Sequence, residues 1–216
     1  MTSSPRRLDL VLRAGLVALA ALLAGLVACQ ETSAPTSSSE ADWAMVDETA
    51  LGAMQRRQVE RAEAARSALF GELMGTLMPL LQGGDTAGAI EVCKDRAPAI
   101  AAEVSARQEL RIGRTSWKLR NPANAPPAWA TPLLEGRPES PRFAAGPDGT
   151  LGATFPILVA EPCLRCHGQA ESLAPTVRAA LDDLYPDDRA TGFAAGDLRG
   201  WFWVEVPAED PQRSDD

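Results

Sequence analysis

The segment Cys163-Leu164-Arg165-Cys166-His167 constrains this chain more than any other stretch of its sequence. Its two thiols are one helical turn apart, and an imidazole follows the second thiol directly. A C-x-x-C-H segment is what covalent attachment of a c-type haem requires, because the cysteines form thioethers with the vinyl groups and the histidine supplies a nitrogen to iron. We therefore expect one covalent haem c at Cys163, Cys166 and His167.

Residues 1–28 have the pattern of an export signal, with a positively charged start followed by an apolar run. The run ends in Leu-Val-Ala before Cys29, which resembles a bacterial lipobox. We expect Cys29 to carry lipid after removal of the residues before it. An ordinary secretory signal or an uncleaved membrane anchor is the alternative. Residues 29–42 are rich in Ser, Thr, Ala and Pro, which is typical of a flexible tether.

The export signal and the C-x-x-C-H motif support each other, because bacteria attach c-type haem outside the cytoplasm. They predict a lipoprotein of the bacterial cell envelope that faces the periplasm and is anchored to a membrane through its lipid. One domain is expected over residues 43–207, followed by a disordered acidic tail at 208–216. The net charge of −8 disfavours binding to nucleic acid.

The cysteine and histidine content narrows the choice of a second iron ligand. The chain contains four cysteines and one histidine, so a second axial histidine within the chain is excluded. With Cys29 assigned to lipid and two cysteines to thioethers, Cys93 has no partner in an oxidising compartment and must be buried, reactive or bound as a ligand. The other candidates are an open position or one of these side chains: Met45, Met54, Met74, Met78, Lys94 and Lys118.

The hydrophobic pattern predicts helices first and an antiparallel sheet afterwards, which is the α+β class with the haem-binding segment inserted. Helical periodicity covers residues 47–81 and 85–105, and Cys93 lies on the apolar face of the second helix. Asp85 is a candidate N-cap, and Pro98 should bend the second helix or break it. A third helix is expected over 173–184. The expected strands are 110–116, 142–145, 150–159 and 201–206.

Five blocks occur in a fixed order between about residue 65 and residue 206. They are AIEVC at 89–93 with Ala97-Pro98, GRTS at 113–116, RNPAN at 120–124, the C-x-x-C-H motif, and YPDDRATGF at 185–193 followed by GDLRG at 196–200. In these blocks the chain resembles the single-haem, PAS-like c-type haem domain family, which also occurs as the extracytoplasmic sensor module of histidine kinases. Phe193 departs from the tyrosine that this family often has there.

The resemblance implies a PAS-like antiparallel sheet with flanking helices. It also implies that haem iron is held by the motif histidine and by a cysteine thiolate, which correspond here to His167 and Cys93. A thiolate stabilises ferric iron and so lowers the reduction potential. Arg114 and Arg120 are candidates for pairing with the haem propionates, because guanidinium matches carboxylate geometry. The alternative is that both are surface arginines on polar loops.

The function expected from these features is electron transfer or redox or gas sensing. The expected partners are a redox protein or a separate signalling protein, with a small gas as a candidate ligand of reduced iron. A peroxidase-like enzyme is a weaker alternative, because a thiolate would occupy the second axial position and the chain has no distal histidine. A structural zinc site of Cys93, Cys163, Cys166 and His167 is a further alternative, although adjacent residues rarely both reach one tetrahedral ion.

Overall fold

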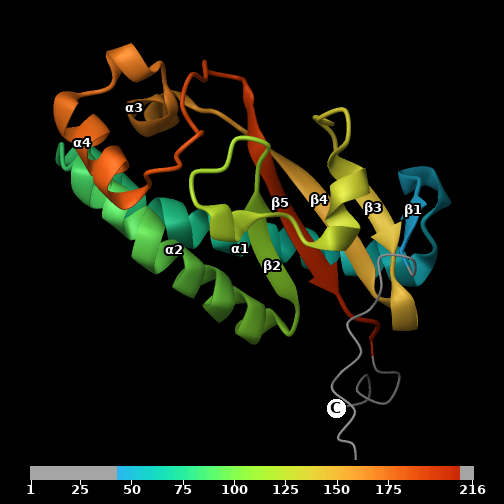
Figure 1. The fold of residues 1–216 in the computed structure, drawn as a ribbon. Coiled ribbons are helices and arrows are strands. Elements are labelled where there is room, and N and C mark those ends of the chain that lie inside the picture. Colours follow the sequence, from blue (N-terminus) through green and yellow to red (C-terminus); the bar gives the residue numbers. More distant parts are fainter. Residues whose placement is uncertain (1–42, 210–216) are drawn as a thin grey trace, which may run out of the picture. The chain divides into compact units, whose positions relative to one another are not determined.

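The computed structural model describes residues 43–209 (Figure 1). Within this range one antiparallel sheet has the strand order β1-β3-β4-β5-β2. Its strands are β1 (Ala44–Val46), β2 (Arg111–Thr115), β3 (Arg142–Ala145), β4 (Leu151–Leu158) and β5 (Leu198–Val206). The α-helices of the same range are α1 (Ala53–Gln82), α2 (Thr86–Gln108), α3 (Leu164–His167) and α4 (Pro175–Leu184). The predicted α+β class is confirmed.

Helices α1 and α2 cover one face of the sheet and form the main core with it. Leu69 and Leu73 of α1 and Ile100 of α2 are buried against Phe155 and Phe202 of the central strands. The inward residues alternate along β4 and β5, as expected for strands with one face on a core. Beyond one end of the sheet, α3 and α4 lie beside α2 (Figure 1).

The two long helices differ in detail from the sequence-based expectation. The first does not start at residue 47, because a short strand and a 3-10 turn (Glu48–Ala50) precede it and the Gln55 side chain accepts the Gly52 N–H at 2.9 Å where the helix begins. The second is one continuous helix with Pro98 inside it, so of the two effects predicted for Pro98, a bend or a break, the break is excluded. Pro98 is exposed, and so is Lys94, whose carbonyl has no N–H donor because of the proline. Asp85 caps this helix as predicted, accepting from Gly88 N–H at 2.9 Å.

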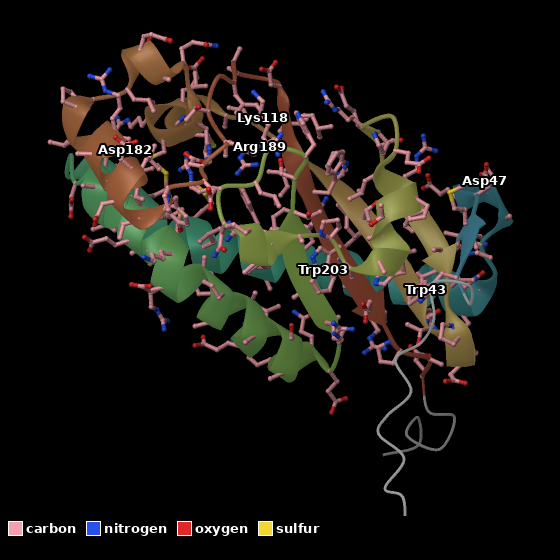
Figure 2. All side chains as sticks on the ribbon, in the orientation of Figure 1. Trp43, Asp47, Lys118, Asp182, Arg189 and Trp203 are labelled. Atoms are coloured by element: carbon pink, nitrogen blue, oxygen red, sulfur yellow. The ribbon has the colours of Figure 1, made fainter. Side chains whose placement is uncertain are left out.

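The opposite face of the sheet is covered by the 3-10 helix η4 (Ala128–Leu134) and by indole rings. Trp43 stacks on Trp129 with ring centroids 4.8 Å apart, and both rings lie against Gly152. Figure 2 labels Trp43 and Trp203 on this side of the molecule. The tryptophan rings therefore pack on the sheet face that the two long helices do not cover.

The predicted hairpin around Pro147-Asp148-Gly149 is present as β3 and β4. β3 pairs with β4 only as far as Thr154, so Pro156 lies where β4 has a neighbour on one side, which agrees with the expected edge position.

Several predictions concern parts of the chain outside the described residues. These are the export signal at 1–28, lipid on Cys29, the tether at 29–42 and most of the tail at 208–216. Within the described range, no helix is both long enough and apolar enough to cross a membrane.

Candidate functional site

The C-x-x-C-H motif lies in a short helical segment between β4 and α4. Cys163 ends a 3-10 turn (Glu161–Cys163) that runs directly into α3, so its thiol and that of Cys166 are one turn apart. The helix closes with a hydrogen bond from Gly168 N–H to the Leu164 carbonyl at 2.9 Å. Cys93, Cys163 and Cys166 are all free thiols.

A large cavity opens beside this motif, between the two long helices and the adjoining ends of β2 and β4. Its empty space is about 1410 Å³ when the part that is open to solvent is included. All of the site residues predicted within the described range line this one cavity: Cys93, Arg114, Arg120, Cys163, Cys166 and His167.

The rest of the cavity wall is mostly apolar. Leu73, Leu77 and Ile90 line it from the helices and Phe202 from the sheet. Two large apolar lining residues are unusually open to solvent for side chains of their type, namely Phe70 at 51% and Leu158 at 53%. The wall therefore suits a mostly apolar group with a few polar substituents.

The ring of His167 has a fixed orientation. Its Nδ1 atom lies 2.7 Å from the carbonyl oxygen of Ala190. Because a carbonyl oxygen only accepts, Nδ1 carries the hydrogen and Nε2 is the nitrogen left for a metal. Burial lowers the pKa of His167 well below its usual value, and the positive charges of Arg120 and Arg199 lower it further. The imidazole is therefore neutral, which is the form that binds metals.

A loop after α4 is attached directly to the end of the motif. Phe193 N–H donates to the His167 carbonyl at 3.0 Å, and Gly192 N–H donates to the Gly168 carbonyl at 2.8 Å. Gly192 has a φ of 80°, which favours glycine at this position. Phe193 packs edge-on against the imidazole, with ring centroids 6.4 Å apart. This loop carries the Ala190 carbonyl and so holds the histidine from one side.

Cys93 faces the cavity from α2. Burial raises the pKa of its thiol, and the positive charges of Arg114, Arg120 and Arg199 partly offset that effect. These arginines give the Cys93 side of the cavity a positive charge. A thiolate or another anion is therefore favoured there over what burial alone would allow.

The three arginines have different partners. Arg114 has no carboxylate within ion-pair distance among residues 43–209, and burial lowers its pKa. Within residues 43–209 the guanidinium of Arg199 donates only to the Lys118 carbonyl, at 3.2 Å, and burial lowers its pKa to about 10. Arg120 is already paired with Asp188. Arg114 and Arg199 are thus the cations that remain for an anionic group.

Two cavity residues were not singled out from the sequence. Arg199 and Tyr185 line the cavity, and both belong to sequence blocks that carried the family resemblance. Their order along the chain gave a signal for family, but no signal for a position beside Cys93.

The alternative zinc site finds no support in this arrangement. No group of three or more His, Cys, Asp and Glu side chains within the described part of the chain is arranged to hold a metal ion. The four residues proposed for zinc share a cavity without forming a tetrahedral cluster.

Comparison with known proteins places this chain in a family. The model of the Tll0287-like family (Tll0287) matches residues 31–207. A solved structure described as the crystal structure of the cyanobacterial heme-protein Tll0287 is 25% identical, covers 72% of this chain and 97% of its own, and has a TM-score of 0.47. None of the curated proteins matches. The family match confirms the resemblance drawn from the sequence blocks, and the chain belongs to the Tll0287-like family.

Proposed function

We propose that this protein is an extracytoplasmic c-type haem protein with one haem, attached through thioethers to Cys163 and Cys166 and ligated by His167 and Cys93. The bound haem would supply a one-electron couple and, in its reduced form, a candidate site for a small gas. Membership of the Tll0287-like family supports this cofactor, because the sequence blocks that indicate the family include the haem-attachment motif.

The observation that carries the proposal is the shared cavity. Cys93 comes from the middle of α2, whereas the motif belongs to α3, yet both line the same apolar cavity. The chain has one histidine and, outside the motif and the lipid site, one cysteine. Both of these potential ligands are therefore present at one site.

The other residues of the cavity fit the remaining parts of a haem. The thiols of Cys163 and Cys166 are one turn apart, as the thioether bonds require. Leu73, Leu77 and Phe202 offer apolar contacts to the macrocycle. Arg114 and Arg199 offer cations to the propionates, and in this role Arg199 is better placed than Arg120, which already has a carboxylate partner.

The proposed setting follows from the start of the chain. Lipid on Cys29 would hold the domain at a membrane on the periplasmic side, where it would exchange electrons with a redox protein or report to a separate signalling protein. The wild-type chain should incorporate a labelled fatty acid in a bacterial host, and a Cys29→Ala chain should not. Labelling of both would contradict anchoring at this residue.

The haem itself is tested by expressing the full chain in a bacterium that matures c-type cytochromes. Wild type and Cys93→Ala should both keep haem after denaturing electrophoresis, because neither lacks a thioether cysteine. Cys163→Ala and Cys166→Ala should each lose one attachment, and the double variant should lose all covalent haem. A wild-type chain without covalent haem would contradict the proposal. Carbon monoxide binding to the reduced protein separates gas sensing from simple electron transfer.

A further inference from the structure

Two segments that are distant in the sequence lie side by side next to the candidate iron ligand. Residues 118–120 follow β2, and residues 188–190 belong to the loop before β5. Arg189 N–H donates to the Leu119 carbonyl at 3.0 Å. Figure 2 labels one residue from each segment, Lys118 and Arg189. The two segments are therefore hydrogen-bonded to each other next to the motif.

Arg120 and Asp188, one from each of these two segments, form a buried ion pair. Arg120 Nη2 lies 3.1 Å from Asp188 Oδ2, and Nε donates to the same oxygen at 3.2 Å. Their side chains are 7% and 9% exposed, whereas each of the other ion pairs of the described residues has a partner that is at least 52% exposed. A buried ion pair gains little stability over apolar residues of similar size. The pair therefore invites an explanation beyond stability.

The same two side chains hold the backbone of Ala190, whose carbonyl orients His167. Asp188 Oδ1 accepts the Ala190 N–H at 2.8 Å. Arg120 Nη2 donates to the Ala190 carbonyl at 3.4 Å and to the Cys166 carbonyl at 2.6 Å. The Ala190 carbonyl in turn accepts from His167 Nδ1 at 2.7 Å. The pair thus holds both the N–H and the carbonyl of Ala190, and Arg120 also holds the motif helix.

We propose that Arg120 and Asp188 are a positioning pair for His167, which fixes its Nδ1–H tautomer and sets the charge balance beside the iron ligand. Its effect on the imidazole is independent of a cofactor, whereas its effect on a reduction potential rests on the proposed function. Hydrogen-bond partners of a ligating histidine fix its tautomer and direction. A negative charge buried near iron favours the ferric state, and a positive charge favours the ferrous state.

The first test examines the imidazole without haem. The chain has one histidine, so the ¹⁵N resonances of the imidazole report His167 alone in the full chain expressed without haem attachment. Wild type should be mainly the Nδ1–H tautomer. Asp188→Asn retains an oxygen that accepts the Ala190 N–H and should keep this tautomer. Asp188→Ala should lower the ratio of the Nδ1–H to the Nε2–H tautomer at least fivefold. A mainly Nε2–H wild type, or a folded Asp188→Ala protein within twofold of wild type, would overturn the proposal.

The second test measures the midpoint potential of the holoprotein. Arg120→Met leaves an anion and should favour ferric iron at least tenfold, about 59 mV for one electron. Asp188→Asn leaves a cation and should shift the potential upwards. Arg120→Lys keeps the charge and should stay near wild type. Arg111→Met, which removes an exposed arginine of β2 paired with Glu205, is the matched control and should change nothing.

The two tests separate the possible failures. The positioning pair is contradicted if Arg120→Met and Asp188→Asn shift the midpoint potential in the same direction, or if both change the ferric-to-ferrous equilibrium less than twofold. In either case the haem assignment stands. If wild type takes up no haem but the tautomer results are as expected, the proposed function fails and the positioning pair stands. Should Arg120→Met fail to fold, Asp188→Asn still gives the sign of the charge effect, and Arg120→Lys remains the variant that keeps the charge.

Discussion

The side chains of Cys93 and His167 line the same cavity, although α2 carries the first and α3 the second. α2 brings its thiol to the cavity because it packs against α4 as well as against α1. His167 is held from the other direction by the loop that carries Ala190. A soft sulfur donor and a neutral imidazole are therefore offered to one site, which is the basis of the functional proposal.

Arg114 should affect stability in opposite directions with and without haem. In the chain without haem it is a largely buried cation with no carboxylate partner within residues 43–209, so Arg114→Met should stabilise the fold by about 1 kcal/mol. In the holoprotein the same change would leave a propionate without its cationic partner and should lower the unfolding free energy by about 1–3 kcal/mol. Denaturant unfolding of both forms measures this, with Arg111→Met as the exposed control. Destabilisation of both forms would contradict an anion-binding role.

Tyr185 should titrate late. Burial and the nearby Cys93 raise its pKa to about 12, although Arg120 and Arg114 oppose the shift. Between the usual value of about 10 and 12 the folded chain keeps a proton that the unfolded chain has lost, so this contribution to stability is complete below about pH 10 and falls as pH rises. The chain has one tyrosine, so the ultraviolet tyrosinate band reports it alone. A midpoint near 10 in the folded protein would contradict this.

Gln58 should be required for stability although it is remote from the cavity. It is 1% exposed, and its Nε2 reaches the carbonyl oxygens of Gly149, Val206 and Pro207 at 2.9, 3.1 and 3.2 Å. Gln58→Leu leaves these acceptors without their donor and should cost about 1–3 kcal/mol in unfolding free energy. Gln82→Leu, at the exposed end of the same helix, should stay within ~0.5 kcal/mol. Equal effects of the two changes would contradict the role of Gln58.

Gly152 and Gly75 should respond in opposite ways to alanine. A Cβ at Gly152 would lie 2.6 Å from Trp129 and 2.7 Å from Trp43, whose stacked rings cannot easily move. Gly152→Ala should therefore destabilise by about 1–3 kcal/mol. A Cβ at Gly75 in α1 meets nothing within 4 Å, so Gly75→Ala should stabilise by about 0.5–1 kcal/mol. Thermal unfolding compares the two, and a stable Gly152→Ala protein would contradict the described packing.

The parts of the fold that depend on local chemistry were predictable. Asp85 caps α2 because a carboxylate at that position accepts a first-turn N–H. The β3–β4 hairpin follows from its turn residues. β1, by contrast, is three residues long and exists through pairing with β3, which lies far along the chain. Such non-local pairing leaves little pattern in a short segment.

The candidate site also has features that a local motif predicts and features that depend on tertiary packing. The spacing of Cys163, Cys166 and His167 is a local motif and was visible in the sequence. The approach of Arg199 to Cys93 depends on how β5 and α2 are placed around the same cavity, which no local pattern encodes. The acceptor for His167 is the backbone carbonyl of Ala190, and a backbone atom has no sequence signature.

The proposed His167 and Cys93 ligation is tested most directly by the ferric absorption and electron paramagnetic resonance spectra of the purified holoprotein. Cys93→Ala removes the thiolate and keeps both attachment cysteines. The variant should therefore retain covalent haem but lose the thiolate-type low-spin spectrum of wild type. A Cys93→Ala spectrum identical to that of wild type would contradict the assignment of Cys93 as the second iron ligand.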